Sequence, residues 1–132
     1  HLPFLQAVLG DFRLVPIVVG DAQPQEMAVL FEALWGAEET LVVVSSDLSH
    51  YLPYEAARRR DGGTARAILE LEGTLVPEDA CGAAPINGLL ALAQRLGLEA
   101  ELLDLRNSGD TAGSRERVVG YGAFAFHEPR HG

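Results

Sequence analysis

The sequence predicts an α/β fold that contains at least one parallel crossover. Two runs rich in β-branched residues, 12–20 and 40–45, flank a segment with the apolar spacing of a helix, 24–35. Further strand-like runs follow a mostly helical region, and alternating strands and helices are typical of sheets whose strands run parallel. Four candidate strands are few for a complete sheet of this kind, so we expect the chain to be a fragment of a longer domain.

Each element has its own local signal. The strand over 12–20 ends at a Gly-Asp turn, and Pro16 within it favours an edge position or a bulge. The helix over 24–35 begins with a proline and is followed by a glycine, the usual start and stop signals. Adjacent glycines, Gly62 and Gly63, predict a break between two short helical pieces. The segments expected after residue 50 are those two pieces, a longer helix and two strands, at 53–59, 64–71, 85–96, 101–106 and 118–126.

Composition excludes several classes of protein. The 132 residues carry 19 acidic and ten basic side chains, a net charge of −9, which argues against a nucleic-acid surface. No apolar run approaches the roughly 18 residues that span a bilayer, so no membrane segment is expected. The single cysteine excludes an internal disulfide framework and fits a reducing, cytoplasmic environment. We expect one domain over residues 1–132.

The first polar motif, Ser-Ser-Asp-Leu-Ser-His-Tyr at 45–51, directly follows the second strand-like run. Functional groups in α/β proteins gather at the ends of strands, where rigid strands hold exposed loops. Asp47 and His50 are three residues apart, and a carboxylate that orients a histidine is a common arrangement for proton transfer. The alternative is structural: Asp47 caps a short helix and His50 packs beside Tyr51.

Cys81 forms the second motif, just before the helix over 85–96. Free amides at a helix start stabilise a thiolate, and a thiolate is a soft ligand for zinc, copper or iron. From spacing alone, a small buried hydrophobe is the commoner role of a lone cysteine.

The third motif is Leu-Arg-Asn-Ser-Gly-Asp-Thr-Ala-Gly at 105–113. A structural turn is the favoured interpretation, because Ser108 and Asp110 can accept hydrogen bonds from loop amides. The alternative is that Arg106 holds an anion or anchors a carboxylate.

Together, the three motifs resemble the Memo family, and most closely its prokaryotic branch, the AmmeMemoRadiSam system protein B. The segments His-Leu-Pro-Phe-Leu-Gln at 1–6 and Val-Val-Gly-Tyr at 118–121 match that family in the same order. The resemblance covers essentially the whole chain, as the C-terminal half of the family's domain.

The resemblance implies a relative of the class III (LigB-like) extradiol dioxygenases, with an α/β/α sandwich around a mostly parallel sheet. It implies a metal pocket in which the first half supplies two histidines and the second half one ligand, here Cys81. His50 would be the acid–base histidine, with Asp47 beside it. The residues expected to surround the metal ligands or to contact the substrate are His1, Ser46, Tyr51, Arg106 and Asp110.

The implied function is a redox or dioxygenase-like enzyme that uses non-haem iron or copper. We expect only weak metal binding by this chain alone, because mononuclear sites normally need three or four protein ligands. The resemblance also implies an AMMECR1-like protein and a radical SAM protein as partners. The alternative is a non-catalytic module that binds a peptide or protein in the same cleft.

Overall fold

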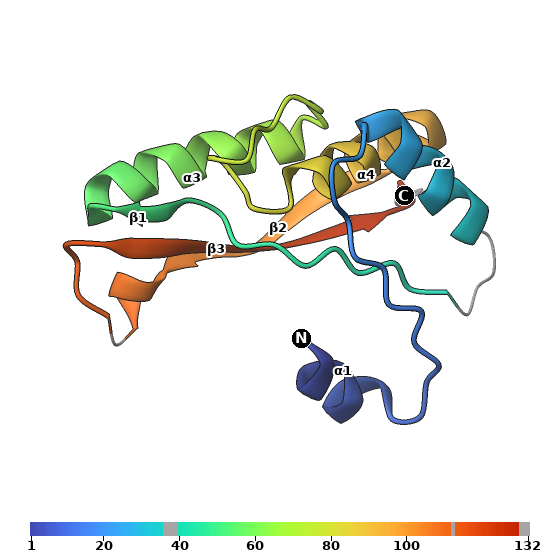
Figure 1. The fold of residues 1–132 in the computed structure, drawn as a ribbon, viewed down its shortest axis with the longest axis horizontal. Helices are drawn as coiled ribbons and strands as arrows, with labels where there is room; N and C mark the ends of the chain where they lie inside the picture. The colour runs from blue at the N-terminus through green and yellow to red at the C-terminus, as the bar shows by residue number, and fades with distance from the viewer. Residues whose placement is uncertain (36–39, 112, 130–132) are drawn as a thin grey trace.

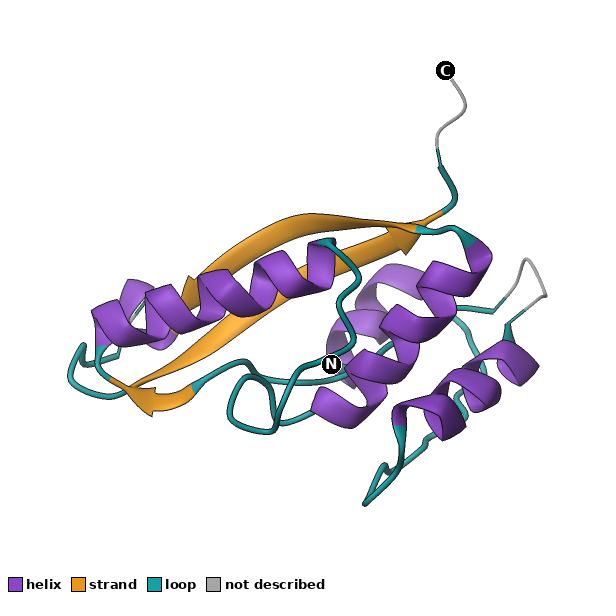
Figure 2. Cartoon of the chain, turned by 90° about the horizontal axis from the view of Figure 1, so that it is seen from above, coloured by secondary structure: helices purple, strands orange, loops and turns teal. Residues whose placement is uncertain are grey.

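Helices and one small sheet make up the structure, a computed structural model that describes residues 1–35, 40–111 and 113–129 (Figure 1). In chain order the elements are α1 (Leu2–Leu9), α2 (Pro24–Leu34), β1 (His50–Leu52), α3 (Tyr54–Leu69), α4 (Ala83–Leu96), β2 (Glu99–Asn107), the 3-10 turn η1 (Ser108–Asp110) and β3 (Val118–His127). Helix α3 packs along β2 and β3, and α2 packs on α4. Figure 2 shows the longest helix, α3, lying over the two long strands.

The mixed α/β class is confirmed, but the expected parallel sheet is wrong for the described residues. The three strands have the order β1-β3-β2, and both neighbouring pairs are antiparallel. The pairing of β2 with β3 requires only a local connection through η1, whereas a parallel pair needs a long crossover. The two strands that were expected to supply parallel neighbours, at 12–20 and 40–45, are not paired into a sheet.

Residues 40–45 nevertheless have the side-chain pattern of a strand. Val42 and Val44 are half-buried against the core, while Leu41 and Val43 point outward and are exposed. Period-two alternation of this kind depends on the fit of the side chains to the core, whereas strand pairing depends on a neighbouring backbone. Within the described part of the chain, no backbone is paired with this segment, so it is extended without being a sheet strand.

The glycine pair does not break α3, which is continuous over 16 residues. Two glycines in a helix interior each cost about 1 kcal/mol relative to alanine. The buried face of α3, which includes Ala57, Ala65 and Ile68, offsets that cost by packing on the sheet and its neighbours. Tertiary packing therefore overrides the local signal at Gly62 and Gly63.

The remaining helices and strands differ from expectation mainly at their ends. Helix α2 is confirmed, with Gln23 and Glu26 forming a reciprocal capping box at its start. Helix α4 begins two residues before Pro85 and ends at Gly97, whose φ of 68° is the left-handed conformation that favours glycine. Helix α1 was not expected. None of the helices within the described ranges is both long and apolar enough to cross a membrane.

Helix α4 lies between two clusters of buried apolar side chains. One cluster joins α4 to α3 and to Leu48, and the other joins α4 to α2. Gly88 allows the close approach of α2, because a Cβ on Gly88 would lie 2.3 Å from the Cβ of Met27 and 3.0 Å from the Pro24 carbonyl oxygen. Cys81 lies two residues before the start of α4, so this packing also helps to fix the position of Cys81.

Gly88→Ala is expected to lower the free energy of unfolding by about 1–3 kcal/mol, because the added methyl group must push α2 away from α4. Gly62→Ala is the matched control. A Cβ at Gly62 meets no atom within 4 Å, so that change should raise stability by up to about 1 kcal/mol. Urea unfolding followed by circular dichroism measures both. Equal effects of the two substitutions would contradict this account of the α2–α4 contact.

Candidate metal site

The loop at 45–50 is held from its inner side. Leu48 is buried in the core, and its N–H donates to the carbonyl oxygen of Gly120 on β3 at 2.9 Å. The N–H of Gly120 in turn donates to the Ser49 carbonyl oxygen at 2.8 Å. With Leu48 and Ser49 facing inward, Asp47 and His50 on either side of them reach the surface.

Two hydrogen bonds with Asp47 join Cys81 to the same loop. Its N–H donates to the Asp47 carbonyl oxygen at 3.2 Å, and its Sγ accepts from the Asp47 N–H, also at 3.2 Å. Ser46 strengthens this junction, because its hydroxyl donates to the Asp47 carbonyl oxygen and accepts from the Gly82 N–H at 2.8 Å. Gly82 has no room for a side chain here, since a Cβ would lie 2.8 Å from the Ser46 Cβ. The start of α4 and the loop therefore form one unit.

Asp47, His50 and Cys81 come together at this unit. One ligand atom from each lies within 4.8 Å of the others, and His50 Nε2 is 3.5 Å from Asp47 Oδ2. Cys81 is exposed and is therefore not a small buried hydrophobe. Asp47 lies just before the strand β1, so the expected alternative of Asp47 as the cap of a short helix is wrong.

The donor set suits a transition metal. A thiolate, an imidazole and a carboxylate are a mixed set of soft, intermediate and hard ligands, which fits iron, copper or zinc and does not suit magnesium or calcium. All three side chains are accessible to solvent, so water or a substrate can complete the coordination of an ion. The residues present fit a metal with open coordination positions.

Two other predicted site residues, His1 and Tyr51, lie next to the loop that carries Asp47 and His50. His1 Nδ1 is 2.8 Å from Ser45 Oγ, which brings the start of α1 next to the loop. Tyr51 follows His50 directly, with ring centroids 5.8 Å apart. Tyr51 has a φ of 59°, rare for a non-glycine residue, and its exposed ring lies under Arg117.

Arg106 and Asp110 make their contacts elsewhere. The Arg106 guanidinium pairs with Asp104 on the same strand at 2.6 Å. Asp110 accepts from the Tyr54 hydroxyl and from the Asn107 N–H. This supports the interpretation of the third motif as a structural turn, because Asp110 satisfies a loop amide.

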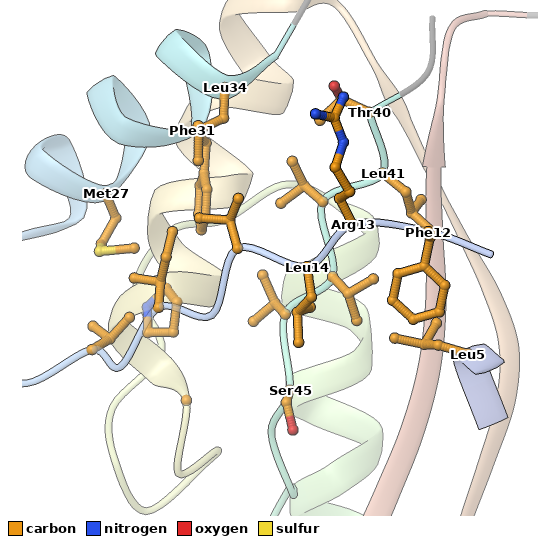
Figure 3. Close-up of a pocket in the computed structure, with 18 of the residues that line it drawn as sticks. Leu5, Phe12, Arg13, Leu14, Met27, Phe31, Leu34, Thr40, Leu41 and Ser45 are labelled. Atoms are coloured by element: carbon orange, nitrogen blue, oxygen red, sulfur yellow. The ribbon is translucent and has the colours of Figure 1, made fainter. Parts of the chain in front are cut away.

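An open groove adjoins the site. It has a volume of about 1340 Å³ and extends from Cys81, Gly82 and Ser45 along residues 40–44 toward residues 12–19. Figure 3 shows Ser45 at one end of the groove and Leu14, Leu41 and Phe12 farther along it. The groove is largely apolar over most of its length, so the polar site lies at one end of an apolar surface.

Two residues that the sequence analysis did not single out contact the loop. Asp61 on α3 accepts from the Ser49 N–H, and Gly120 pairs with Leu48 and Ser49. A glycine inside a strand can mark a place where another part of the chain approaches the backbone closely. The sequence around Gly120 could therefore have indicated such a contact. Asp61 follows three arginines in an apparently solvent-facing run, and nothing local marks it as buried.

The chain is similar to known proteins over most of its length. A family profile described as Memo-like protein matches residues 1–125. The chain belongs to the Memo family. A MEMO1 family protein of Archaeoglobus fulgidus is 38% identical over 96% of this chain, and one of Desulfurococcus amylolyticus is 33% identical over 96%. The Memo chain spans about half the length of these relatives, 52% and 50% respectively.

The Tyr54–Asp110 hydrogen bond gives this Memo chain a pH-dependent contact. Two hydrogen bonds to its carboxylate lower the pKa of Asp110 below its usual 3.8. The bond from the Tyr54 hydroxyl has the larger effect, and the bond from the Asn107 N–H has the smaller one. The hydrogen bond between Tyr54 and Asp110 is also the main reason that the pKa of Tyr54 is raised above 10.0. The carboxylate therefore stabilises the fold above its ordinary pKa, and this contribution is lost as pH falls through the lowered value.

Tyr54→Phe is expected to lower the melting temperature at about pH 7 and to narrow the difference in melting temperature between about pH 7 and about pH 3. The control is Tyr121→Phe, which removes a hydroxyl from a half-exposed tyrosine on β3 and should keep the wild-type pH dependence. Scanning calorimetry over this pH range measures the effect. Parallel pH profiles for wild type and Tyr54→Phe would contradict the assigned contact.

Proposed function

We propose that this Memo-family chain carries a metal-binding cleft for iron or copper, in which Cys81 is the thiolate ligand. The observation that supports this most directly is the convergence of Asp47, His50 and Cys81, whose ligand atoms lie within 4.8 Å of one another. The residues come from two segments more than 30 positions apart, and hydrogen bonds join those segments. Such an arrangement is hard to explain as a solvated surface turn.

Each side chain has a distinct chemical task. Cys81 Sγ accepts from the Asp47 N–H, which holds the sulfur, a soft metal ligand, beside the loop. The Asp47 carboxylate, 3.5 Å from His50 Nε2, can orient the imidazole ring for proton transfer. When bound, iron or copper would supply redox chemistry or polarise a ligand.

The proposal extends to the longer protein in which this half-length chain would act. Three donors from one chain favour modest affinity, and the family resemblance implies two further histidine ligands. An enzyme with dioxygenase-like or redox activity, working in the cytoplasm with an AMMECR1-like protein and a radical SAM protein, is the most specific form of this proposal.

The groove favours a second candidate function. Its apolar lining and its opening beside Cys81 suit a peptide or protein segment with apolar side chains. In this alternative the three polar residues would fix the orientation of a ligand without catalysing a reaction. Turnover of an aromatic diol, measured beside metal binding, separates the two candidates.

Cys81→Ala should weaken binding of Cu²⁺ or Fe²⁺ by about tenfold or more, because it removes the thiolate. The melting temperature should change little, since the side chain is exposed. His127→Ala is the control for adventitious binding by histidine, because His127 lies beside Glu101 near the far end of β3. Titration calorimetry measures the affinities. An unchanged affinity in Cys81→Ala would remove the metal proposal.

His50→Ala is expected to leave most of the metal affinity intact and to abolish proton-dependent turnover. The reason is a division of tasks between the Cys81 thiolate, which holds the metal, and the His50 imidazole, which carries the proton. Turnover and metal content are measured on the same preparation. Wild-type turnover in His50→Ala would exclude His50 from the mechanism and favour the binding module.

A further inference from the structure

We infer that Asp61 on α3 is a positioning residue that, together with Gly120, sets the conformation of the loop carrying Asp47 and His50. The inference rests on the proposed metal site for its functional meaning. Its structural part, the fixing of the loop, stands on contacts that do not involve a metal.

Asp61 is a buried carboxylate that contacts the loop directly. Its side chain is only 3% exposed, and Oδ1 accepts from the Ser49 N–H at 3.0 Å. Ser49 is completely buried, so its N–H has no access to water and needs a protein acceptor. Leaving this buried donor unpaired would be costly, so loop conformations that break the Ser49–Asp61 hydrogen bond are unfavourable.

Gly120 makes room for this carboxylate. A Cβ on Gly120 would lie 2.1 Å from Asp61 Oδ2, closer than atoms can approach. The main chain of Gly120 also pairs with the loop, through the Leu48 N–H and the Ser49 carbonyl oxygen. The absence of a side chain at Gly120 therefore lets both α3 and β3 bind Ser49, while β3 also binds Leu48.

Different contacts hold Asp47 and His50, the two functional residues of the loop. Asp47 is fixed by Cys81 through hydrogen bonds in both directions. His50 follows Ser49, whose N–H is bound by Asp61 and whose carbonyl oxygen is bound by Gly120. A rotation of the Ser49 backbone would move His50 away from Asp47 and Cys81, so Asp61 controls the position of the imidazole relative to the thiolate.

A stabilising role alone does not account for these contacts. Burying a carboxylate carries a desolvation cost, and a neutral amide could accept the same hydrogen bond at lower cost. A charged acceptor forms the stronger bond to a backbone N–H, which favours rigidity of the loop over the stability of the whole chain. Asp61 contacts Ser49 and none of the three proposed metal-site side chains, so its effect on the site would pass through the position of His50.

The test compares Asp61→Ala, Asp61→Asn, Gly120→Ala and the double variant Asp61→Ala/Gly120→Ala in the protein. Gly63→Ala, at a glycine with no atom within 4 Å of an added Cβ, is the matched control for a glycine substitution. Three readouts are measured: thermal unfolding, hydrogen exchange of the Ser49 and His50 amides, and the thiolate-to-metal absorption band with Cu²⁺ or Co²⁺. Exchange is measured without added metal.

Asp61→Ala and Gly120→Ala should speed exchange at Ser49 and His50 by about tenfold or more. They should also shift the absorption band of bound Co²⁺, while the chain remains folded. Asp61→Asn keeps a neutral acceptor for the Ser49 N–H and should give exchange rates between those of the wild type and those of Asp61→Ala. The double variant should lose less than the sum of the single changes, because Gly120→Ala meets no carboxylate when Asp61 is absent.

Wild-type exchange at Ser49 and His50 in a folded Asp61→Ala variant would overturn the inference. If Asp61→Ala does not fold, Asp61→Asn and Gly120→Ala carry the test, and unchanged exchange in Gly120→Ala would then overturn it. The two proposals fail separately. Absence of metal binding by the wild type would overturn the metal site, while the exchange measurements would still decide the role of Asp61.

Discussion

The need of buried backbone groups for hydrogen-bond partners governs the structure around residues 46–50. Residues 46–49 precede β1 and are not part of a regular ladder, so their backbone hydrogen bonds go to several separate elements. Gly120 on β3 binds Leu48 and Ser49, Cys81 before α4 binds Asp47, and Asp61 on α3 binds Ser49. Three elements that are distant in sequence meet because one short segment requires all of them.

The same requirement explains why the site lies where it does. Because Leu48 and Ser49 turn inward to reach these partners, the residues on either side turn outward. Asp47 and His50 therefore emerge on the surface beside Cys81, which is brought there by its own main-chain bonds to Asp47. The packing of α2 on α4 at Gly88 supports this arrangement from a distance, since it fixes the helix that follows Cys81.

Sequence patterns predicted the elements whose signals are local. The helices α2 and α4 and the strands β2 and β3 follow from apolar periodicity and from proline and glycine at their ends. The topology was not predictable in the same way, because pairing depends on which backbone lies alongside. Residues 40–45 have the alternating burial of a strand and yet pair with nothing within the described ranges. Continuity of α3 through Gly62 and Gly63 likewise depends on packing that no local window contains.

The candidate site was partly predictable for a related reason. Asp47, His50 and Cys81 are chemically conspicuous residues at the ends of regular segments, and such positions gather functional groups. Asp61 carries no comparable signal, since an aspartate after three arginines resembles a solvated helix face. Only the three-dimensional structure shows that the carboxylate turns inward, past a glycine that leaves space for it.

The contacts around the three donors also bear on how a metal would bind. The hydrogen bonds that place Asp47 and Cys81 join protein groups to one another, so the donors are held close together by the fold itself. A site arranged in this way loses little conformational freedom when it binds an ion, which favours affinity. Solvent access to all three residues acts in the opposite direction, because water competes for the ion and for the carboxylate. If this half-length Memo chain binds a metal as proposed, the number of protein donors, rather than the cost of arranging them, would limit its affinity.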